Sequence, residues 1–441
     1  MPGIVRKKKG GQVYPPDWSQ IGYDDTPIST LNGFNYAKNI QDNWDTSVHT
    51  YTEKYRDDYH LMYFPKMDDT ITVSMERCAR MFQGSNLEYF DSSLPFVQEF
   101  SSMFASCKNL RYCRITGLDT PGVGLTNANG LFTDCYEIRE VDIDFSDLPS
   151  GCTQAKNVFS GCWKLEKAYV ENEYIELADG TFQNTYKMQE CYVDLPKCRE
   201  CSFYAMGSQN DDGTKVHINI GNTSTYSNTH VSFEKAKISA EPHPLATGDV
   251  IGMITLHKVD SAQSIFRDAV LLSTEDINNA YISVQPDTGH TMNCSYMFQR
   301  TTVKGSSLSS LNIGKFSNGN YMFDHLVIED SSKELVLTDV DFSSATTLNY
   351  AFANMDVKSI IGIDSADLSS CTSMTDMFSG SNTLDNITVN KILLALTSAT
   401  AYTGTKTLAA LGFNSTYYPS ATIQSLSNYS AFTSAGWSIG Y

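Results

Sequence analysis

The chain is organised around residues 157–170, Asn-Val-Phe-Ser-Gly-Cys-Trp-Lys-Leu-Glu-Lys-Ala-Tyr-Val. Phe159 is the one bulky residue at the start of this stretch, and the small residues Gly161 and Cys162 follow it, as a tight turn requires. Three apolar residues come next, at Leu165, Ala168 and Val170. Their spacing is that of a short strand with one buried face, so the stretch predicts a turn followed by a strand.

The same cassette recurs along most of the chain. The Phe anchors of the first part stand 22, 28, 27 and 23 residues apart, at Phe82, Phe104, Phe132, Phe159 and Phe182. Those of the second part stand 32, 25, 29 and 26 residues apart, at Phe266, Phe298, Phe323, Phe352 and Phe378. This period and the strand pattern are typical of leucine-rich repeats. The clearest strands are predicted at 110–115, 138–143, 165–170, 188–193 and 384–389.

The third residue after the Phe is Cys or Ser in five copies, at Ser85, Cys107, Cys135, Cys162 and Ser381. A small residue suits an inward turn beside a bulky ring. One copy cannot bury its own apolar side, but a stack of copies forms a continuous core. The predicted fold class is therefore a repeat solenoid, leucine-rich-repeat-like, with one short parallel strand per coil and N- and C-terminal capping units. The alternative is an ordinary α/β protein in which the spacing is accidental.

The repeats divide the chain into six segments. The first two are an extended N-terminal arm at 1–27 and a helical N-terminal cap at 28–60, where Phe34, Ala37, Ile40 and Trp44 recur at helical spacing. Leucine-rich-like repeats follow at 61–205, irregular coils or an insertion at 206–262, and further repeats at 263–390. A C-terminal capping unit at 391–441 is expected to contain helices at 391–398 and 425–436.

Composition limits the possible functions. The formal net charge is −18, which disfavours binding to nucleic acid. No run of 18 apolar residues exists, so membrane insertion is not expected. The basic start is followed by Gly-Gly-Gln rather than by an apolar stretch, so no secretory signal peptide is expected. The eleven cysteines are an odd number, and most lie near repeat anchors, which favours reduced, buried thiols.

No motif for chemistry stands out. The eight histidines are scattered singly, and no zinc-protease pair, nucleophile elbow, phosphate loop or dinucleotide fingerprint appears. Cys198 and Cys201, with Cys191 upstream, lack the further ligands that a zinc site needs. We therefore expect no catalytic, cofactor-binding or metal-binding residues, no cofactor and no enzyme activity. A pair of glycosidase carboxylates leaves no local signature, so a carbohydrate-active enzyme on a repeat scaffold stays as an alternative.

Two surfaces are candidates for binding. The outward positions of the predicted strands in the first half carry aromatic and basic side chains, which form a candidate binding strip of Tyr112, Arg114, Arg139, Lys167, Tyr169 and Tyr192. A merely solubilising surface is the alternative. The N-terminal arm holds a candidate attachment segment of Arg6, Lys7, Lys8, Lys9, Tyr14 and Trp18, for which a solvated, disordered head is the alternative.

At residues 371–384, Cys-Thr-Ser-Met-Thr-Asp-Met-Phe-Ser-Gly-Ser-Asn-Thr-Leu, the chain resembles the Met-Phe repeat of BspA-like leucine-rich surface proteins. The resemblance covers roughly residues 60–400 and is most specific at 365–389 and 145–170. It implies adhesion or surface display, without catalytic residues to carry over.

The flanks resemble repeat proteins encoded by phages of gut Bacteroidales. They read Gly-Phe-Asn-Tyr-Ala-Lys-Asn-Ile-Gln-Asp-Asn-Trp-Asp at 33–45, Asn-Lys-Ile-Leu-Leu-Ala-Leu at 390–396 and Ala-Gly-Trp-Ser-Ile at 435–439. This implies a virion component, a tail or head appendage or fibre, assembled in the host cytoplasm and exposed after lysis. Its expected partners are other virion proteins through the arm, a host surface protein or glycan, and a second copy of the chain. A bacterial cell-surface adhesin is the alternative.

Overall fold

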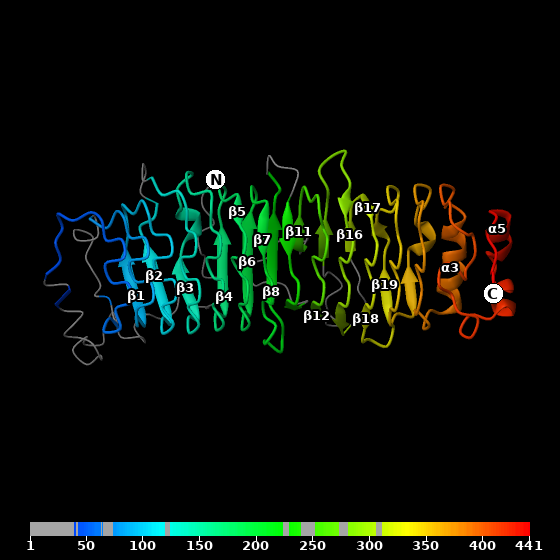
Figure 1. Cartoon of the computed structure of the whole chain (residues 1–441), viewed down its shortest axis with the longest axis horizontal. Coiled ribbons are helices and arrows are strands. Elements are labelled where there is room, and N and C mark those ends of the chain that lie inside the picture. The colour runs from blue at the N-terminus through cyan, green and yellow to red at the C-terminus, as the bar shows by residue number, and fades with distance from the viewer. Residues whose placement is uncertain are drawn as a thin grey trace. The chain divides into compact units, whose positions relative to one another are not determined.

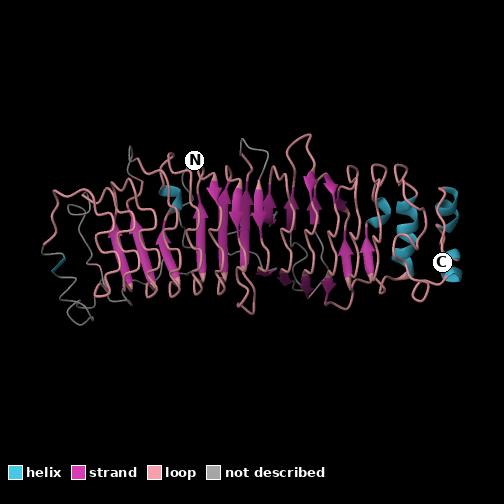
Figure 2. Ribbon diagram, viewed as in Figure 1, coloured by secondary structure: helices cyan, strands magenta, loops and turns pink. Residues whose placement is uncertain are grey.

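The structure is a computed structural model that describes residues 39–40, 43–62, 64, 74–119, 124–223, 229–239, 252–272, 281–305 and 311–441. The chain divides into two units, residues 1–210 and 211–441. In each unit the chain winds as a parallel β-solenoid whose strands pair with those of neighbouring coils (Figures 1 and 2). The predicted fold class is confirmed.

The first unit contains three sets of parallel strands. β1 (Tyr89–Ser93), β2 (Tyr112–Thr116) and β3 (Glu140–Ile143) form one sheet, and the short 3-10 helix η3 (Phe145–Asp147) follows β3. β4 (Lys167–Glu171) pairs with β6 (Glu190–Leu195), and β5 (Leu177–Ala178) pairs with β7 (Glu200–Ser202). The strands β2, β3, β4 and β6 begin two residues later than the sequence pattern predicted.

The second unit builds its coils on more than one sheet. Its main sheet contains β8 (Lys215–Ile220), β11 (Gly252–Leu256), β13 (Tyr281–Val284), β16 (Leu311–Ile313) and β20 (Asp339–Val340). A second sheet contains β10 (Lys237–Ser239), β12 (Val270–Leu272), β15 (Thr302–Lys304) and β18 (Val327–Ile328). Shorter pairs join β14 (Met292–Asn293) to β17 (Phe316–Asn318) and β19 (Glu334–Val336) to β21 (Ser359–Ile361). The strand β9 (His230–Ser232) and the 3-10 helix η4 (Ile363–Ser365) complete the unit's short elements.

The anchor phenylalanines form a buried column within each unit. In the first unit the rings of Phe82, Phe104, Phe132, Phe159, Phe182 and Phe203 follow one another at centroid distances of 5.5, 5.4, 5.8, 5.9 and 5.1 Å. In the second unit the rings of Phe233, Phe266, Phe298, Phe323, Phe352, Phe378 and Phe413 do so at 5.3, 5.1, 5.4, 5.4, 5.4 and 5.2 Å. All thirteen side chains are buried, as predicted for the ten anchors of the repeat pattern, and Phe203, Phe233 and Phe413 extend the columns beyond them.

The backbone on both sides of the Phe is left-handed in most coils. In the coil of Phe159, for example, Asn157 has φ 55° and Gly161 has φ 74°. A Cβ on Gly161 would lie 2.4 Å from Oδ1 of Asp134 in the preceding coil, so the left-handed turn and the close approach both favour glycine there.

In five coils the residue three positions after the Phe donates a hydrogen bond to the preceding coil. The thiols of Cys107, Cys135 and Cys162 donate hydrogen bonds to the carbonyl oxygens of Phe82, Phe104 and Phe132, at 2.9, 3.0 and 3.1 Å. The hydroxyls of Thr301 and Ser381 do the same for Phe266 and Phe352, at 2.7 and 2.6 Å. In these five coils the small side chain at this position therefore also acts as a hydrogen-bond donor, whereas Ala236, Ala269 and Leu326 fill the same position without donating.

All eleven cysteines are buried, and none forms a disulfide. Burial raises the pKa of the Cys107 and Cys198 thiols to about 12, so neither forms a thiolate at neutral pH. The cysteines are structural side chains of the core.

The N-terminal part of the repeat array begins earlier than predicted. Residues 43–58 form turns rather than the expected helix, and residues 28–38 and 41–42 lie outside the described part. Tyr55 takes the place of a Phe anchor: its ring stacks on Phe82 at 5.8 Å, and its N–H donates to the carbonyl of Met81. The left-handed backbone of Glu53 and Asp57, on either side of Tyr55, is incompatible with a helix.

The predicted strand at 384–389 is wrong. The helix α3 (Asn386–Leu396) occupies this position, with Asp385 as its N-cap accepting a hydrogen bond from the Thr388 N–H. Val389, Ile392, Leu393 and Leu396 are buried at helical spacing, whereas Ile387, which the strand pattern placed inward, is 69% exposed. The Asp385 N-cap and the helical spacing of the apolar residues outweighed the strand pattern.

Two short helices complete the C-terminal end. They are α4 (Ser420–Gln424) and α5 (Tyr429–Ser434), where one helix was expected over 425–436. Ser438 then forms an isolated parallel bridge with Thr407. Most of α5 presents small polar side chains to solvent, as a terminal coil should.

Replacing Phe159 with alanine should lower the free energy of unfolding by about 3–5 kcal/mol, because a fully buried ring in a continuous column leaves a cavity. Chemical denaturation followed by circular dichroism measures the change. Trp163→Ala, in the same coil but with its side chain 45% exposed, should cost about 1.5 kcal/mol or less. Equal losses in the two variants would contradict the buried column.

The donor role of the third position after the Phe can be separated from its size. Cys162→Ser keeps a donor for the Phe132 carbonyl and should be more stable than Cys162→Ala by about 0.5–1.5 kcal/mol. Cys191, which lies in the core on β6 and not after a Phe, is the control, and there the serine variant should be the less stable one. The same order at both positions, measured by denaturation, would refute the donor role.

Candidate functional site

The predicted binding strip falls into groups on separate strands. On β2, the ring of Tyr112 stacks on Tyr89 of β1 at 5.8 Å. The guanidinium of Arg114 lies between two carboxylates whose side chains are 5% exposed, with Nε 3.3 Å from Asp142 and Nη1 4.0 Å from Asp91. These contacts hold both side chains against their neighbours on the sheet.

The second group lies on β4 and β6. Nζ of Lys167 is 3.4 Å from Oε1 of Glu190, and the hydroxyl of Tyr169 donates to Oε2 of the same carboxylate at 2.8 Å. Tyr192 stands in register with Tyr169. Burial, with the charges of Asp194 and Glu171, raises the pKa of Tyr192 to about 12, so its hydroxyl stays neutral.

The six strip residues do not all lie on one sheet. β3 and β4 belong to different sheets, so Tyr112 and Arg114 are in one sheet while Lys167, Tyr169 and Tyr192 are in another. Arg139 precedes β3 and is exposed, because the strand begins two residues later than predicted. The charged groups of the strip are largely paired within the chain, which suits a stabilising, solvated sheet face. The attachment residues Arg6, Lys7, Lys8, Lys9, Tyr14 and Trp18 lie outside the described residues.

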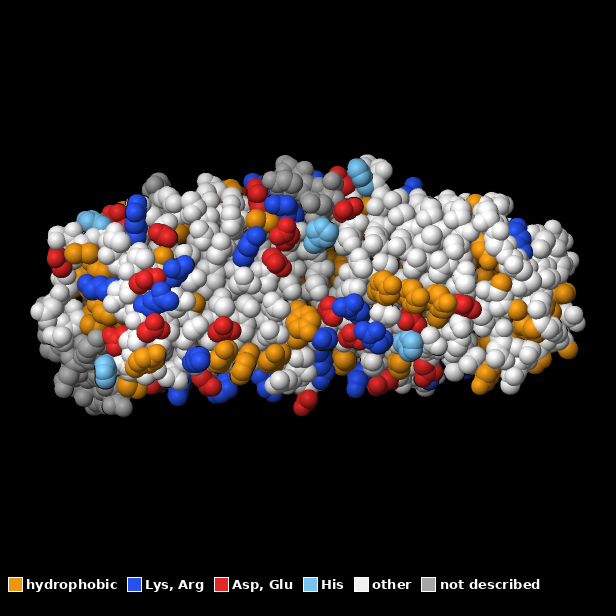
Figure 3. Space-filling model, in the orientation of Figure 1, with side chains coloured by type: hydrophobic (Ala, Val, Ile, Leu, Met, Phe, Trp, Pro, Cys, Tyr) orange, Lys and Arg blue, Asp and Glu red, His pale blue; other side chains and the backbone are white. Residues whose placement is uncertain are grey.

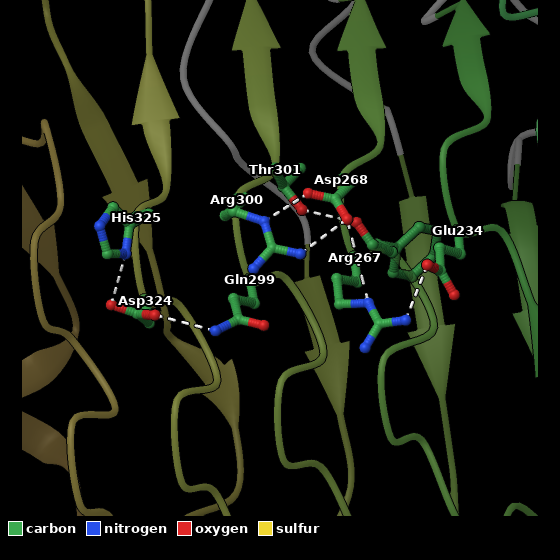
Figure 4. A network of polar contacts seen from close by, with 9 residues as sticks. Glu234, Arg267, Asp268, Gln299, Arg300, Thr301, Asp324 and His325 are labelled. Carbon is green, nitrogen blue, oxygen red and sulfur yellow. Dashed lines mark hydrogen bonds and ion pairs between the residues drawn. The ribbon is translucent and has the colours of Figure 1, made fainter.

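The second unit carries a ladder of polar side chains that the sequence analysis did not predict (Figure 4). It uses the first two positions after successive anchors: Arg267 and Asp268 follow Phe266, and Gln299 and Arg300 follow Phe298. Asp324 and His325 follow the next anchor in the same way, and Glu234 belongs to the preceding coil. A fixed offset from the Phe was the signal that could have revealed the ladder.

The arginine contacts of this ladder join one coil to the next. Nη2 of Arg267 lies 2.7 Å from Glu234, and Arg300 holds Asp268 through two contacts, Nε to Oδ1 at 2.5 Å and Nη2 to Oδ2 at 2.8 Å (Figure 4). The hydrogen bond from Arg300 is the main reason that the pKa of Asp268 falls below its usual value. Such bidentate pairs are directional, so they fix the register between coils.

Asp324 is the most enclosed acid of the ladder. Its side chain is 7% exposed and accepts from Nε2 of Gln299 at 3.0 Å and from Nδ2 of Asn354 at 3.1 Å. Nδ1 of His325 lies 2.8 Å from Oδ1, the oxygen that Asn354 also contacts, while Gln299 contacts Oδ2 (Figure 4). Neighbouring coils therefore share this carboxylate as a hydrogen-bond acceptor, which is a structural role.

A ladder of tyrosines lies two residues before the anchors in the second unit. The rings of Tyr296, Tyr321 and Tyr350 stack at 5.0 and 4.9 Å, nearly parallel. The hydroxyl of Tyr350 donates to Asp376 at 3.0 Å, and this hydrogen bond raises its pKa.

Within the described residues, no group of three or more His, Cys, Asp or Glu side chains is placed to hold a metal ion. Cys198 and Cys201, which suggested zinc, are both buried, and the Cys198 thiol donates to the carbonyl of Glu200 at 3.2 Å. No helix in the part of the chain that the structure describes is long and apolar enough to cross a membrane.

Comparison with known proteins gives one match. The family model described as Mycoplasma protein of unknown function, DUF285, matches residues 248–331 of the 441. No curated protein and no solved structure matches the chain. The match and the solenoid are compatible with a BspA-like repeat protein and suggest a repeat surface protein of unknown function.

The Asp268–Arg300 pair should contribute a small, pH-dependent stability. Asp268→Asn should lower the free energy of unfolding by about 0.2–1 kcal/mol at neutral pH, because one partner is half exposed. The folded-state pKa of Asp268 is depressed, so the contribution is present above the ordinary value of 3.8 and is lost as the pH falls below it. Urea denaturation at pH 7 and pH 3 measures this, and a difference between variant and wild type that grows at pH 3 would contradict it.

Proposed function

We propose that the chain is a non-enzymatic structural and binding protein, and in particular a bacteriophage virion component, a tail or head appendage or fibre. The structural role rests on one observation, which is that polar side chains connect neighbouring coils. Thiols, hydroxyls, carboxylates and guanidinium groups at fixed offsets from the Phe join coil to coil. A stack built in this way is a rigid spacer that displays the same side-chain positions in every coil.

The support for a virion role lies in the flanks, which resemble leaders and ends of repeat proteins encoded by phages of gut Bacteroidales. The arm at 1–27 carries four consecutive basic residues and four prolines. Such a segment cannot bury enough apolar surface alone to offset the entropy of ordering, so a partner would order it. The proposed partners are other virion proteins at the arm and a host surface molecule, or a second copy of the chain, along the solenoid.

A bacterial cell-surface adhesin is the second candidate. The DUF285 match and the resemblance to BspA-like proteins favour it, since both concern the repeat and not the flanks. Immunogold labelling of purified phage particles and of intact cells would separate the two. Label on particles supports the virion role, and label confined to the cell envelope would replace it with the adhesin.

The arm gives a sharper test. Deleting residues 1–20 should leave the fold intact, because the described coils begin beyond residue 43, but should abolish incorporation into particles. Circular dichroism of the purified protein and quantification of the protein in purified particles measure the two effects. Normal incorporation of the folded deletion variant would place attachment elsewhere in the chain.

A further inference from the structure

The first unit carries an aromatic row on the edge at which its main strands begin. The row consists of the residue four positions after the anchor in successive coils, Lys108, Tyr136, Trp163 and Tyr186. Tyr136 and Trp163 stack at 4.2 Å, and Trp163 and Tyr186 lie 6.2 Å apart at 34°. Nζ of Lys108 lies over the Tyr136 ring at 5.8 Å. We call these four residues the aromatic row.

The aromatic row is on the surface. Trp163 is 45% exposed, Lys108 is exposed, and the two tyrosines are half-buried. In Figure 3, hydrophobic and basic side chains, with some acidic ones among them, gather along the lower edge of the first unit. The Phe rings of the column are all buried, whereas the indole of Trp163 lies outside the column and is exposed. The indole therefore has no role in the core.

Tyr136 and Trp163 turn their faces toward each other and so present their ring edges to solvent, whereas the rings of Trp163 and Tyr186 are tilted by 34°. An aromatic ring is negative on its face and positive at its edge. Lys164 and Lys187 directly follow Trp163 and Tyr186, and Nζ of Lys187 donates to the carbonyl of Gln209 at 2.8 Å. Glu137 offsets one of them, at 2.7 Å from Lys164. The edge is therefore positive and partly apolar on a chain whose net charge is −18.

The shape of the aromatic row limits the class of partner that the row can bind. The row is one side chain wide and follows successive coils, whereas a stable protein interface takes about 800 Å² and 20–30 residues from each side. A linear polymer that lies along the coils can use such a narrow row, and the stacked rings need little further ordering when it binds. Stacked faces leave little room for nucleic-acid bases, which bind to aromatic faces.

We propose that the aromatic row binds a linear acidic polysaccharide, a polymer whose repeating sugars carry carboxylate groups. The carboxylates would meet Lys108, Lys164 and Lys187, and the sugar rings would lie along the edges of Tyr136, Trp163 and Tyr186. This inference rests on the proposed binding function and names its ligand class. It does not depend on the virion role.

The probe is polygalacturonate immobilised on a sensor surface, with dextran as a neutral polymer and poly-glutamate as an acidic peptide. The full-length wild-type protein should bind polygalacturonate in a salt-sensitive manner. Trp163→Ala and the double variant Lys108→Gln/Lys187→Gln should each weaken binding about tenfold or more, the scale of an interface hot spot. Both double-variant sites lie at exposed turn positions, and circular dichroism verifies that each variant folds.

The second unit supplies a matched control. Tyr321→Ala disrupts a stacked row of the same kind that has acidic rather than basic neighbours, and it should leave binding unchanged. Absence of wild-type binding, equal binding to dextran, tighter binding to poly-glutamate, or equal loss in Tyr321→Ala would each overturn the proposal. Particle incorporation would be unaffected by any of these results, so failure here is distinguishable from failure of the virion role.

Discussion

The structure depends on the hydrogen bond that the backbone N–H of each anchor Phe donates to the next coil. Phe132 donates to Val158 and Phe159 donates to Thr181, both at 2.9 Å, and the same pattern holds at the anchors of the second unit. These bonds set the separation of the coils at the turn, and ring spacings of 5.1–5.9 Å follow from it. The Phe ring and the Phe N–H act at the same place in each coil. The Phe column therefore forms the core and also sets the spacing of the coils. A side chain at a fixed offset from the Phe is therefore brought to hydrogen-bonding or stacking distance of the next coil. Inside the coils this accounts for the hydrogen bonds of the thiols and hydroxyls. On the surface it accounts for the charged and aromatic ladders.

The sequence predicted the parts of the fold that this spacing controls. Phe spacing and the small residue after it sufficed for the buried column, the parallel strands and the repeat class. The failures occurred where a local signal competed with the repeat. At 384–389 a strand pattern coincided with Asp385, which caps a helix, and a short apolar run cannot distinguish the two structures. At 43–58 a helical spacing of large residues concealed a coil in which Tyr55 replaces the Phe.

The candidate site was less predictable, for a physical reason. Whether an outward side chain is available depends on its neighbours in adjacent coils, which lie some 20–30 residues away in the chain. Arg114 looked like an exposed base from its own strand, but Asp91 and Asp142 enclose it from either side. Trp163 lies within residues 157–170, but its exposure depends on the geometry of the turn, which only the structure gives. The polar ladder and the aromatic row each occupy a constant number of residues after the Phe. Their positions are therefore visible in the sequence when they are counted from the Phe and not from the strand.

The two units use the same offset differently, and this limits the aromatic row to the first one. Four residues after the anchor, the chain of the second unit enters β10, β12, β15 and β18, whose first residues are Lys237, Val270, Thr302 and Val327. These segments are rich in β-branched residues, which favour a strand. In the first unit the same offset carries Lys108, Tyr136, Trp163 and Tyr186, followed by Asn, Glu or Lys, and the chain makes a turn before the strand begins four residues later. A turn leaves its side chains outside the sheet, so only there can large rings accumulate without burying polar neighbours. The residue at this one offset is mostly β-branched in the second unit and mostly aromatic in the first, and it accompanies the choice between a second sheet and an exposed turn.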